Sequence, residues 1–427
     1  MTNVADLPTN PTDAGPLAPR VPRSYRCRCG RPVFFRNSLC HGCGAALGYE
    51  PQRGQVLALD PGPDENTWQV DGDAQTPYRR CGNFDTIAGC NWLVPASADG
   101  SFQPLCQACR LNRTIPDLTQ PDHAELWRRI ELARRRLVSQ LISLGLPVAS
   151  RVAGDDQDAE RGLMFDVLAP LPGAPAVMTG HASGLITLNL DEADDAVRER
   201  IRAAMREPYR TLLGHFRHEV GHYYWDRLVA GTPWLEGYRE LFGDERDDYA
   251  ASLQRHYANG PAPDWAQRHV SSYASTHPWE DWAETWAHYL HMVDTHDTAL
   301  SFGLDARAVA IEIEPFEADV LWRPDDPGAA HFLSFVNEWV ALTSVLNELS
   351  RSMGQHDFYP FVLPRPVVAK LQFVHLVVQA AATEPQTATP VEEPPAATDA
   401  DTDAAMAPET PAVSAAPAAA ASAPRSG

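Results

Sequence analysis

The sequence predicts an α+β protein, in which a cysteine-rich amino-terminal module precedes a mainly helical domain with a small sheet. Three observations support this prediction. All eight cysteines lie between Cys27 and Cys109. Farther along the chain, several segments with apolar residues at helical spacing surround two short strand-like runs. Residues 381–427 are rich in Ala, Pro, Thr, Ser and acidic residues and have almost no large apolar side chain, so they cannot form a core.

The eight cysteines have the spacing of two structural zinc sites. The first group is Cys27, Cys29, Cys40 and Cys43, and the second is Cys81, Cys90, Cys106 and Cys109. In the first group a glycine follows each pair, which lets the backbone turn so that amides point at thiolate sulfur. Four thiolates give a closed tetrahedral site, which stabilises a fold but does not catalyse. A redox dithiol pair and a different partition of the eight cysteines are the alternatives.

Charge and apolar patterning indicate a soluble, cytoplasmic protein. The formal charge of −21 argues against nucleic-acid binding by the whole molecule. The segment 20–43 nevertheless has six arginines and no carboxylate, so a protein or nucleic-acid contact through this basic part is open. The first twenty residues lack the apolar region of a signal peptide, and we expect no stretch able to span a membrane.

The domain organisation follows from these patterns. We expect residues 1–20 to be disordered, 21–118 to form a double zinc ribbon with short hairpins, 119–380 to form the helical domain, and 381–427 to be a disordered tail. Within the helical domain, the spacing predicts a helix over 122–145, capped by Asp122 and ended by Gly145. The other predicted elements are strands over 162–168 and 184–190, a helix over 194–206, and two helices between 330 and 379.

One stretch of the helical domain, residues 208–228, contains the candidate metal ligands and a candidate catalytic base. It contains His218-Glu219-Val220-Gly221-His222, with Pro208 placed to begin the helix. Two histidines four residues apart lie on one helix face, so both imidazoles can reach one metal ion, for which zinc is the natural candidate. Glu219 is placed to take a proton from a water at that metal. Gly221 is unfavourable within a helix, which indicates that another part of the chain approaches this face closely.

A catalytic zinc needs a third protein ligand, and the best source is the segment 277–290. Its helical spacing places Glu280, Glu284 and His288 on one stripe of an aromatic-rich helix. We assign Glu280 as the ligand and Glu284 as the acceptor of the remaining N–H of a ligand histidine, which fixes its tautomer. The reverse assignment, with Glu284 as the ligand, stays open, and so does His277.

These residues carry a resemblance to known families. The motif at 218–222 followed by Glu280-x-x-x-Glu284 looks like the glutamate-zincin metallopeptidases, and residues 279–291 are similar to the zinc-binding helix of the anthrax lethal factor catalytic domain. From Cys27 to about Val378, the chain resembles a bacterial family of zinc-binding metallopeptidases with an amino-terminal zinc ribbon. The pieces that carry this resemblance include CNWLV, LCQACRLNRTIPDL, LFGDERDDY and NELSRSMGQHDFYPFVL.

The resemblance implies a zincin-like fold and further roles. Tyr273 would donate to the oxyanion formed during hydrolysis. In zinc peptidases the strand before the metal helix is a sheet edge that pairs with substrate, which would make Gly184, Leu185, Ile186 and Thr187 substrate-binding residues. A strand buried within the sheet is the alternative. The chain departs from many zincins in the long spacer between His222 and Glu280, where residues 244–265 must fold locally.

The function expected from the sequence is that of a zinc metallopeptidase, with one catalytic and two structural zinc ions, Glu219 as general base and a peptide or protein substrate. One alternative is a binding module whose ribbons recognise nucleic acid or protein beside a regulatory or inactive zincin domain. Another is a protein that is auto-inhibited or processes itself.

Overall fold

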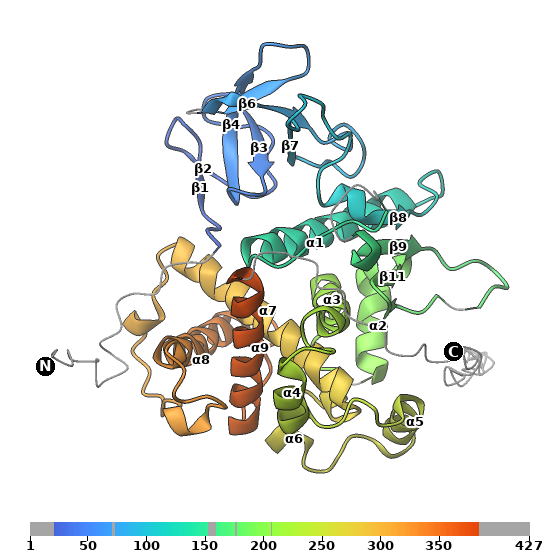
Figure 1. The fold of residues 1–427 in the computed structure, drawn as a ribbon, viewed down its shortest axis with the longest axis vertical. Coiled ribbons are helices and arrows are strands. Elements are labelled where there is room, and N and C mark those ends of the chain that lie inside the picture. The colour runs from blue at the N-terminus through green and yellow to red at the C-terminus, as the bar shows by residue number, and fades with distance from the viewer. Residues whose placement is uncertain (1–20, 71–72, 153–158, 176, 206, 384–427) are drawn as a thin grey trace, which may run out of the picture. The chain divides into compact units, whose positions relative to one another are not determined.

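The structure is a computed structural model that describes residues 21–383 apart from 71–72, 153–158, 176 and 206. It confirms the α+β class, with small sheets in the amino-terminal part and helices with one further small sheet in the rest (Figure 1). The last helix, α9 (Arg365–Thr383), extends three residues into the predicted tail. The remainder of that tail and the predicted disordered segment 1–20 lie outside the described residues.

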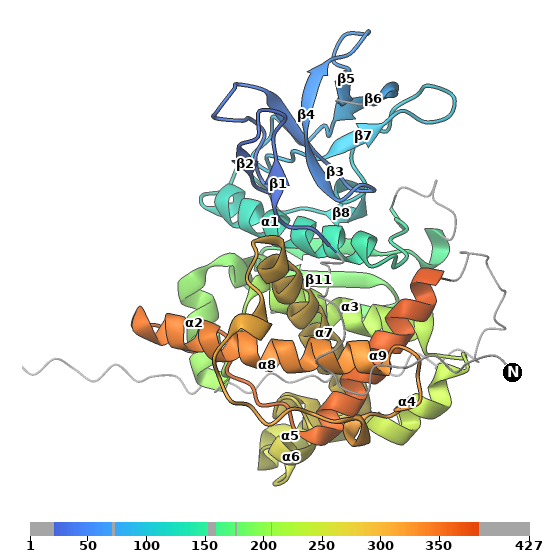
Figure 2. The same cartoon turned by 90° about the vertical axis from the view of Figure 1, so that its left-hand side faces the viewer.

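The amino-terminal part contains a larger sheet than the short hairpins expected from the sequence. A two-stranded pair, β1 (Tyr25–Arg26) and β2 (Pro32–Val33), precedes five antiparallel strands (Figure 2). These strands, in spatial order, are β3 (Ala46–Glu50), β4 (Gln55–Pro61), β5 (Trp68–Val70), β6 (Asp73–Arg80) and β7 (Leu93–Pro95). The sequence predicts a strand fragment over 91–94, which overlaps β7, but it does not predict β3 or β5, which are short and lack a clear apolar alternation.

The second sheet has four strands and lies beside the helices. In spatial order its strands are β10 (Gly180–Ala182), β11 (Leu185–Asn189), β9 (Met164–Leu168) and β8 (Asn112–Thr114). β11 is parallel to β9 and antiparallel to β10. The two predicted strands therefore form at β9 and β11, and β10 gives β11 a neighbour on its other side.

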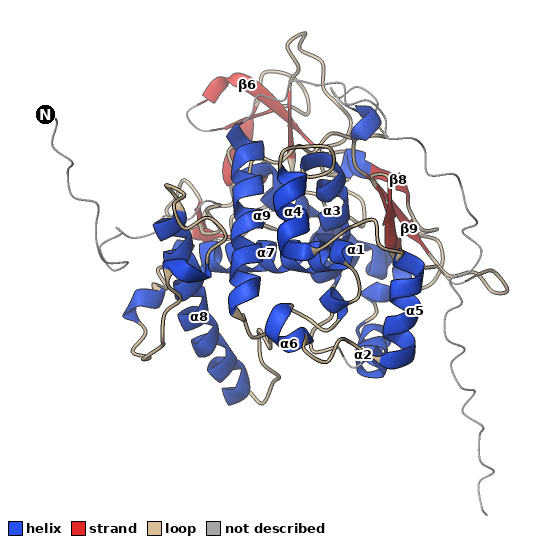
Figure 3. Cartoon of the chain, turned by 60° about the horizontal axis from the view of Figure 1, so that its bottom comes forward, coloured by secondary structure: helices blue, strands red, loops and turns tan. Residues whose placement is uncertain are grey.

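Helices make up most of the carboxyl-terminal part (Figure 3). Besides α9, they are α1 (His123–Ser143), α2 (Asp195–Met205), α3 (Leu212–Leu228), α4 (Trp234–Phe242), α5 (Tyr249–Asn259), α6 (Trp265–Arg268), α7 (Pro278–Ser301) and α8 (Ala329–Ser352). The predicted helix 122–145 is present as α1, but Asp122 has φ of 64° and its side chain makes no capping hydrogen bond. Gly145 ends the helix with a positive φ, as expected.

The helix that carries the H-E-x-x-H motif begins later than predicted. α3 starts at Leu212, and the hydroxyl of Thr211 caps it by accepting a hydrogen bond from the Gly214 N–H at 3.0 Å. Pro208 therefore precedes the helix and does not occupy its first turn. The cap at Thr211 satisfies one of the first-turn amides, which have no partner within the helix.

α3 and α7 cross closely at Gly221, which explains that glycine. A Cβ atom at this position would lie 3.0 Å from Cα of Ala283 on α7, closer than ordinary contact permits without movement. The indole N–H of Trp282, also on α7, donates to the carbonyl oxygen of Gly221 at 2.8 Å. The absence of a side chain thus lets the two helices approach until the residues on their facing sides meet.

The amino-terminal part is bonded directly to the helices. The guanidinium of Arg23, which is 4% exposed, donates to the carboxylate of Asp294 on α7. The amide of Val21 donates to Asp297 on the same helix at 3.0 Å. Asp294 also accepts from Arg217, the residue just before the motif, at 2.8 Å. One buried carboxylate therefore connects Arg23, near the start of the described chain, to α7 and α3.

Two helices, α8 and α9, are long and apolar enough to cross a membrane by length and composition alone. The sequence had led us to expect no such stretch, and on this criterion that expectation is wrong. Within the structure 50% of the α8 window and 61% of the α9 window are buried. Core helices pass the same test, so these two are weak evidence for a membrane.

Candidate metal centre and active site

The structure brings the predicted ligands together from the crossing helices. Nε2 of His218 lies 3.0 Å from Oε2 of Glu280, and Nε2 of His222 lies 3.7 Å from the same oxygen. With zinc–ligand bonds of about 2.0–2.1 Å, the ligand atoms of a tetrahedral site lie about 3.3 Å apart. The three side chains therefore fit one zinc ion. Glu280 is 1% exposed and its Oε2 atom has no hydrogen-bond partner in the described part of the chain, as expected of an oxygen reserved for a cation.

Local structure on α7 presents Glu280 to α3. His277 occupies the N-cap position, where Nδ1 accepts from the Trp279 N–H at 3.1 Å, and Pro278 follows in the first turn. Nε2 of His277 lies 3.0 Å from the carbonyl oxygen of Asp247. Both ring nitrogens are thus engaged in holding the backbone, so His277 is a structural residue and not the third ligand.

Charge keeps the Glu280 carboxylate ionised. Burial by itself raises the pKa of Glu280, but the neighbouring His222 and His218 outweigh it and hold that pKa well below its usual range. The ring of Trp279 packs on His222 with centroids 4.3 Å apart. This aromatic wall excludes water from one side of the imidazole and restricts its orientation.

Glu284 lies one turn after Glu280 and holds His218. Nδ1 of His218 is 2.7 Å from Oε1 of Glu284, and the hydroxyl of Ser271 donates to Oε2 at 2.7 Å. Nδ1 of His218 is therefore the protonated nitrogen, and Nε2 is left to face Glu280. This is the arrangement expected from the sequence for Glu284, with Ser271 as a further partner that no motif indicated.

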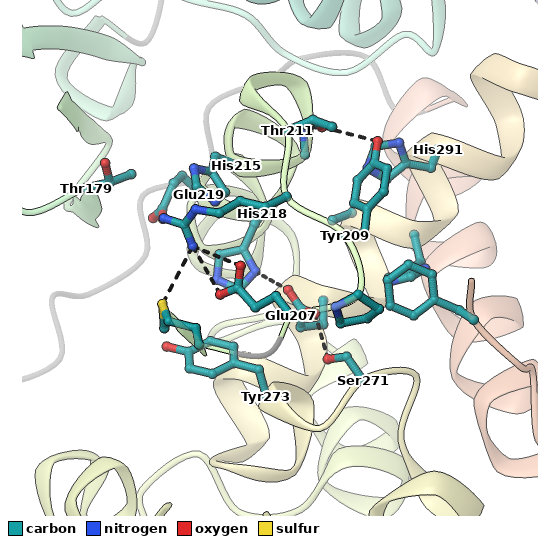
Figure 4. Close-up of a pocket in the computed structure, with 18 of the residues that line it drawn as sticks. Thr179, Glu207, Tyr209, Thr211, His215, His218, Glu219, Ser271, Tyr273 and His291 are labelled. Carbon is teal, nitrogen blue, oxygen red and sulfur yellow. Dashed lines mark hydrogen bonds and ion pairs between the residues drawn. The ribbon is translucent and has the colours of Figure 1, made fainter. Parts of the chain in front are cut away.

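Glu219 is the candidate general base and faces a cavity. The cavity has a volume of about 480 Å³, and His218, Glu219, Glu284 and Tyr273 are among its lining residues (Figure 4). Burial raises the pKa of Glu219, and this effect exceeds the opposing influence of His218 and His222. A carboxylate with a raised pKa is a better proton acceptor near neutral pH.

Two tyrosines approach the centre. Tyr273 lies in a short 3₁₀ turn (Tyr273–Ser275) before α7, with its ring 6.0 Å from that of His218, and burial raises its pKa so that the hydroxyl keeps its proton. Tyr249 comes from α5, in the spacer, and its hydroxyl donates to Oε1 of Glu280 at 2.6 Å. Tyr249 had no predicted role, although it is the last residue of the segment LFGDERDDY, which carries the family resemblance.

The structure corrects the prediction that residues 184–187 form a free edge of the sheet. Leu185, Ile186 and Thr187 lie in β11, which pairs with β9 on one side and with β10 on the other, and Gly184 immediately precedes it. The backbone of 185–187 is therefore not the free edge of the sheet; that edge belongs to β10. His181 on β10 stacks on His222 with centroids 6.1 Å apart, so β10 is the strand next to the metal centre. The signal that could have revealed β10 is Ser183-Gly184, the two-residue turn with positive φ at both positions that joins it to β11.

Both groups of cysteines form clusters that fit zinc. Sγ atoms of Cys27 and Cys43 are 3.6 Å apart, and those of Cys90 and Cys106 are also 3.6 Å apart. Zinc–sulfur bonds of about 2.3 Å give sulfur separations of about 3.8 Å in a tetrahedral site, whereas a disulfide requires about 2.05 Å. Backbone amides of Cys43 and Gly42 lower the pKa of Cys40 to about 6, which favours a thiolate. The four-and-four partition expected from the sequence matches these clusters.

The fold and the site together define a protein with two four-cysteine clusters and a His–His–Glu metal centre of H-E-x-x-H type. Comparison with known proteins agrees with this description. Residues 123–377 match the family described as "Putative zinc-binding metallo-peptidase", and residues 24–120 match a zinc-ribbon domain. The chain belongs to this zinc-binding metallopeptidase family.

The matches to related proteins cover almost the whole length of those proteins. An uncharacterized protein of Mycobacterium tuberculosis (strain ATCC 25618 / H37Rv) is 42% identical over 364 residues, covering 85% of this chain and 97% of its own. An uncharacterized protein of Mycobacterium bovis matches with the same identity and coverage. No solved structure matches significantly.

Proposed function

We propose that this protein is a zinc-dependent peptidase whose active site is formed by α3 and α7. The observation that carries the proposal is the placement of Glu219 next to a His–His–Glu group and on a cavity of about 480 Å³. A purely structural metal site has no need of a carboxylate base or of an adjoining space for a ligand.

The residues have separate roles in peptide hydrolysis. His218, His222 and Glu280 would hold a zinc ion, whose positive charge would acidify a water molecule and polarise a carbonyl group. Glu219 takes a proton from the attacking water and afterwards delivers it to the leaving amine. The hydroxyl of Tyr273 donates a hydrogen bond to the developing oxyanion. The raised pKa of Glu219 favours both steps, because the carboxylate accepts a proton from water and the carboxylic acid then donates it to the amine.

Binding of nucleic acid or protein through the amino-terminal module has less support. Among the arginines of its basic segment, Arg23 is buried in the pair with Asp294, and Arg28 pairs with Asp60 at 2.7 Å. These two guanidinium groups are already engaged within the chain. A docking role for the module, an intracellular location and the absence of membrane contact remain predictions.

The test is peptide cleavage by the Glu219→Gln variant. Wild-type protein loaded with metal and the variant are incubated with a library of proteome-derived peptides, and products are identified by mass spectrometry. We expect cleavage by the wild type only, while both proteins hold three zinc ions per chain, one for each cluster. Absence of cleavage by fully loaded wild type, or full turnover by the variant, would contradict the proposal.

A further inference from the structure

A hydrogen bond from the spacer reaches the metal centre. Tyr249 is the first residue of α5, and its hydroxyl donates to Oε1 of Glu280 at 2.6 Å. Its ring packs against the rings of His277 and Trp279, with centroids 5.2 and 6.2 Å away. The spacer between the two metal helices is therefore more than a connection, because one of its side chains touches a candidate ligand.

The two oxygens of Glu280 have different surroundings. Oε2 faces Nε2 of His218 and of His222 and has no hydrogen-bond partner among the described residues, whereas Oε1 accepts from Tyr249. The terminal torsion of a glutamate is otherwise broad, so a carboxylate held at one oxygen loses rotational freedom. This hydrogen bond selects the orientation in which Oε2 points at the ion.

The position of Tyr249 is itself fixed at two points. Asp248 caps α5, its carboxylate accepting from the Ala251 N–H at 2.9 Å. The carbonyl oxygen of Asp247 lies 3.0 Å from Nε2 of His277, whose Nδ1 caps α7. His277 thus joins the start of α5 to the start of the helix that carries Glu280. A rigid connection of this kind lets a hydroxyl hold its acceptor within a few tenths of an ångström.

We propose that Tyr249 is a positioning residue of the metal centre, which holds Glu280 so that a single oxygen binds the ion. The inference concerns the same site as the proposed function and rests on it for the catalytic meaning of that ion. The quantity that the inference predicts is the metal affinity of the His–His–Glu site, which can be measured without any substrate. Removing the hydroxyl leaves Oε1 buried without its donor, and loss of such an outer contact lowers metal affinity by about 10–100-fold.

The experiment uses the full-length chain with Tyr249→Phe, which keeps the ring and removes only the hydroxyl. A chelator first removes metal from the His–His–Glu site, and retention of two zinc ions per chain shows that the cysteine clusters stay loaded. Cobalt is then titrated in, and visible absorption without thiolate-to-cobalt charge transfer reports binding at this site. We expect the cobalt dissociation constant to rise by about 10–100-fold.

The matched control is Tyr223→Phe. Tyr223 lies on α3 next to His222, and its hydroxyl donates to the Arg161 carbonyl oxygen at 3.0 Å. This control loses a hydrogen bond of similar kind, but one that does not touch a ligand. Its cobalt affinity should stay within about twofold of wild type, and an equal loss in both variants would overturn the specific role of Tyr249.

A second pair of variants separates positioning from general destabilisation. In a Glu280→Ala background, adding Tyr249→Phe should leave the cobalt affinity unchanged, because the hydrogen bond has already lost its acceptor. An equal loss in both backgrounds, or no loss in either, would overturn the proposal. Failure of the wild type to cleave peptides would refute the proposed function and leave this cobalt result standing, so the two failures are distinguishable.

Discussion

Nδ1 of His218 lies 2.7 Å from Oε1 of Glu284, and this contact fixes which nitrogen of the histidine is available to a metal. The carboxylate is held in turn by Ser271. Burial raises the pKa of Glu284, but the contact with His218 outweighs it, so the group stays ionised. An ionised acceptor makes the imidazole a more basic ligand. Metal binding at this site should therefore depend on Glu284, although Glu284 is not among the three candidate ligands.

We predict that Glu284→Gln lowers zinc affinity at the His–His–Glu site by about 10–100-fold. The amide keeps one oxygen but loses the charge, and it must present its NH₂ group to either His218 or Ser271. Chelator competition on the full-length protein measures the effect. Glu338→Gln is the control, because Glu338 forms a similar buried pair with His296 at 3.0 Å elsewhere in the fold. Equal affinities for the Glu284 variant and wild type would contradict the prediction.

We predict that Tyr273→Phe lowers kcat for peptide hydrolysis by about 10²–10³ and changes KM little. A donor that contacts only the oxyanion stabilises the transition state and not the bound substrate. Zinc content should be unchanged, because Tyr273 is not among the three candidate ligands. Steady-state kinetics with one identified substrate peptide are the measurement, with Tyr223→Phe as the reference for loss of a hydroxyl. An unchanged kcat would remove Tyr273 from the reaction.

Much of the metal centre could be predicted because its information is local. The i, i+4 spacing of His218 and His222, and of Glu280 and Glu284, places each pair on one helix face whatever the rest of the fold does. Gly221 likewise indicated a close approach, which proves to be the crossing with α7. A periodic pattern predicts which side chains share one face of a helix. The face with the two histidines and the face with the two glutamates can bind one metal ion only if the two helices pack against each other.

The features that sequence reasoning missed have local causes in two cases and a long-range cause in the third. β10 has three residues, and only its pairing with β11 makes it the edge strand that displaces the expected substrate edge at 184–187. Tyr249 is an ordinary spacer residue until the start of α5 is anchored beside His277. The cap at Thr211 escaped notice because Pro208 offered an equally plausible helix start. The Thr211 cap and the pairing of β10 with β11 are local, so the sequence contained their signals. Only the position of Tyr249 depends on a contact between segments far apart in the chain, which a local pattern could not contain.

Protonation of His288 should make part of the stability depend on pH. This residue is 5% exposed, its Nδ1 lies 2.6 Å from the hydroxyl of Tyr359, and burial lowers its pKa to about 4. The unfolded chain has the ordinary histidine pKa of about 6.5, so it binds a proton first as the pH falls. The stability associated with neutral His288 is complete above pH 6.5 or so and declines towards pH 4, by about 3 kcal/mol in all.

The corresponding variant is His288→Asn, which places a polar group near Nδ1 and does not titrate. We expect the variant to be less stable than wild type at pH 7, and the difference to shrink by about 3 kcal/mol between pH 7 and pH 4. Urea denaturation of both proteins at matched pH and zinc concentration measures this difference, so that metal release affects both alike. A difference that stays constant over this range would show that His288 is not held neutral by the fold.

The carboxylate of Asp294 should be among the groups whose loss most destabilises the protein. It pairs with Arg23, Arg136 and Arg217, each at 2.8 Å. Although burial raises the pKa of Asp294, these three cations outweigh it and hold that pKa well below the usual range. The stability from its ionised form is therefore complete at pH 7 and is lost only as the pH falls below about 4.

We predict that Asp294→Asn lowers the free energy of unfolding at pH 7 by about 3–5 kcal/mol, because it leaves buried guanidinium groups without a counter-charge. Asp60→Asn is the control, since the pair of Asp60 with Arg28 is largely exposed and should contribute about 1 kcal/mol or less. Urea denaturation followed by tryptophan fluorescence compares the two. Because Asp294 links Arg23 to Arg217, the Asp294 variant should also expose the segment around Arg23 to limited proteolysis while the cysteine clusters keep their zinc. Equal stabilities of the two variants would show that the buried ion pairs of Asp294 contribute no more to stability than the exposed pair of Asp60.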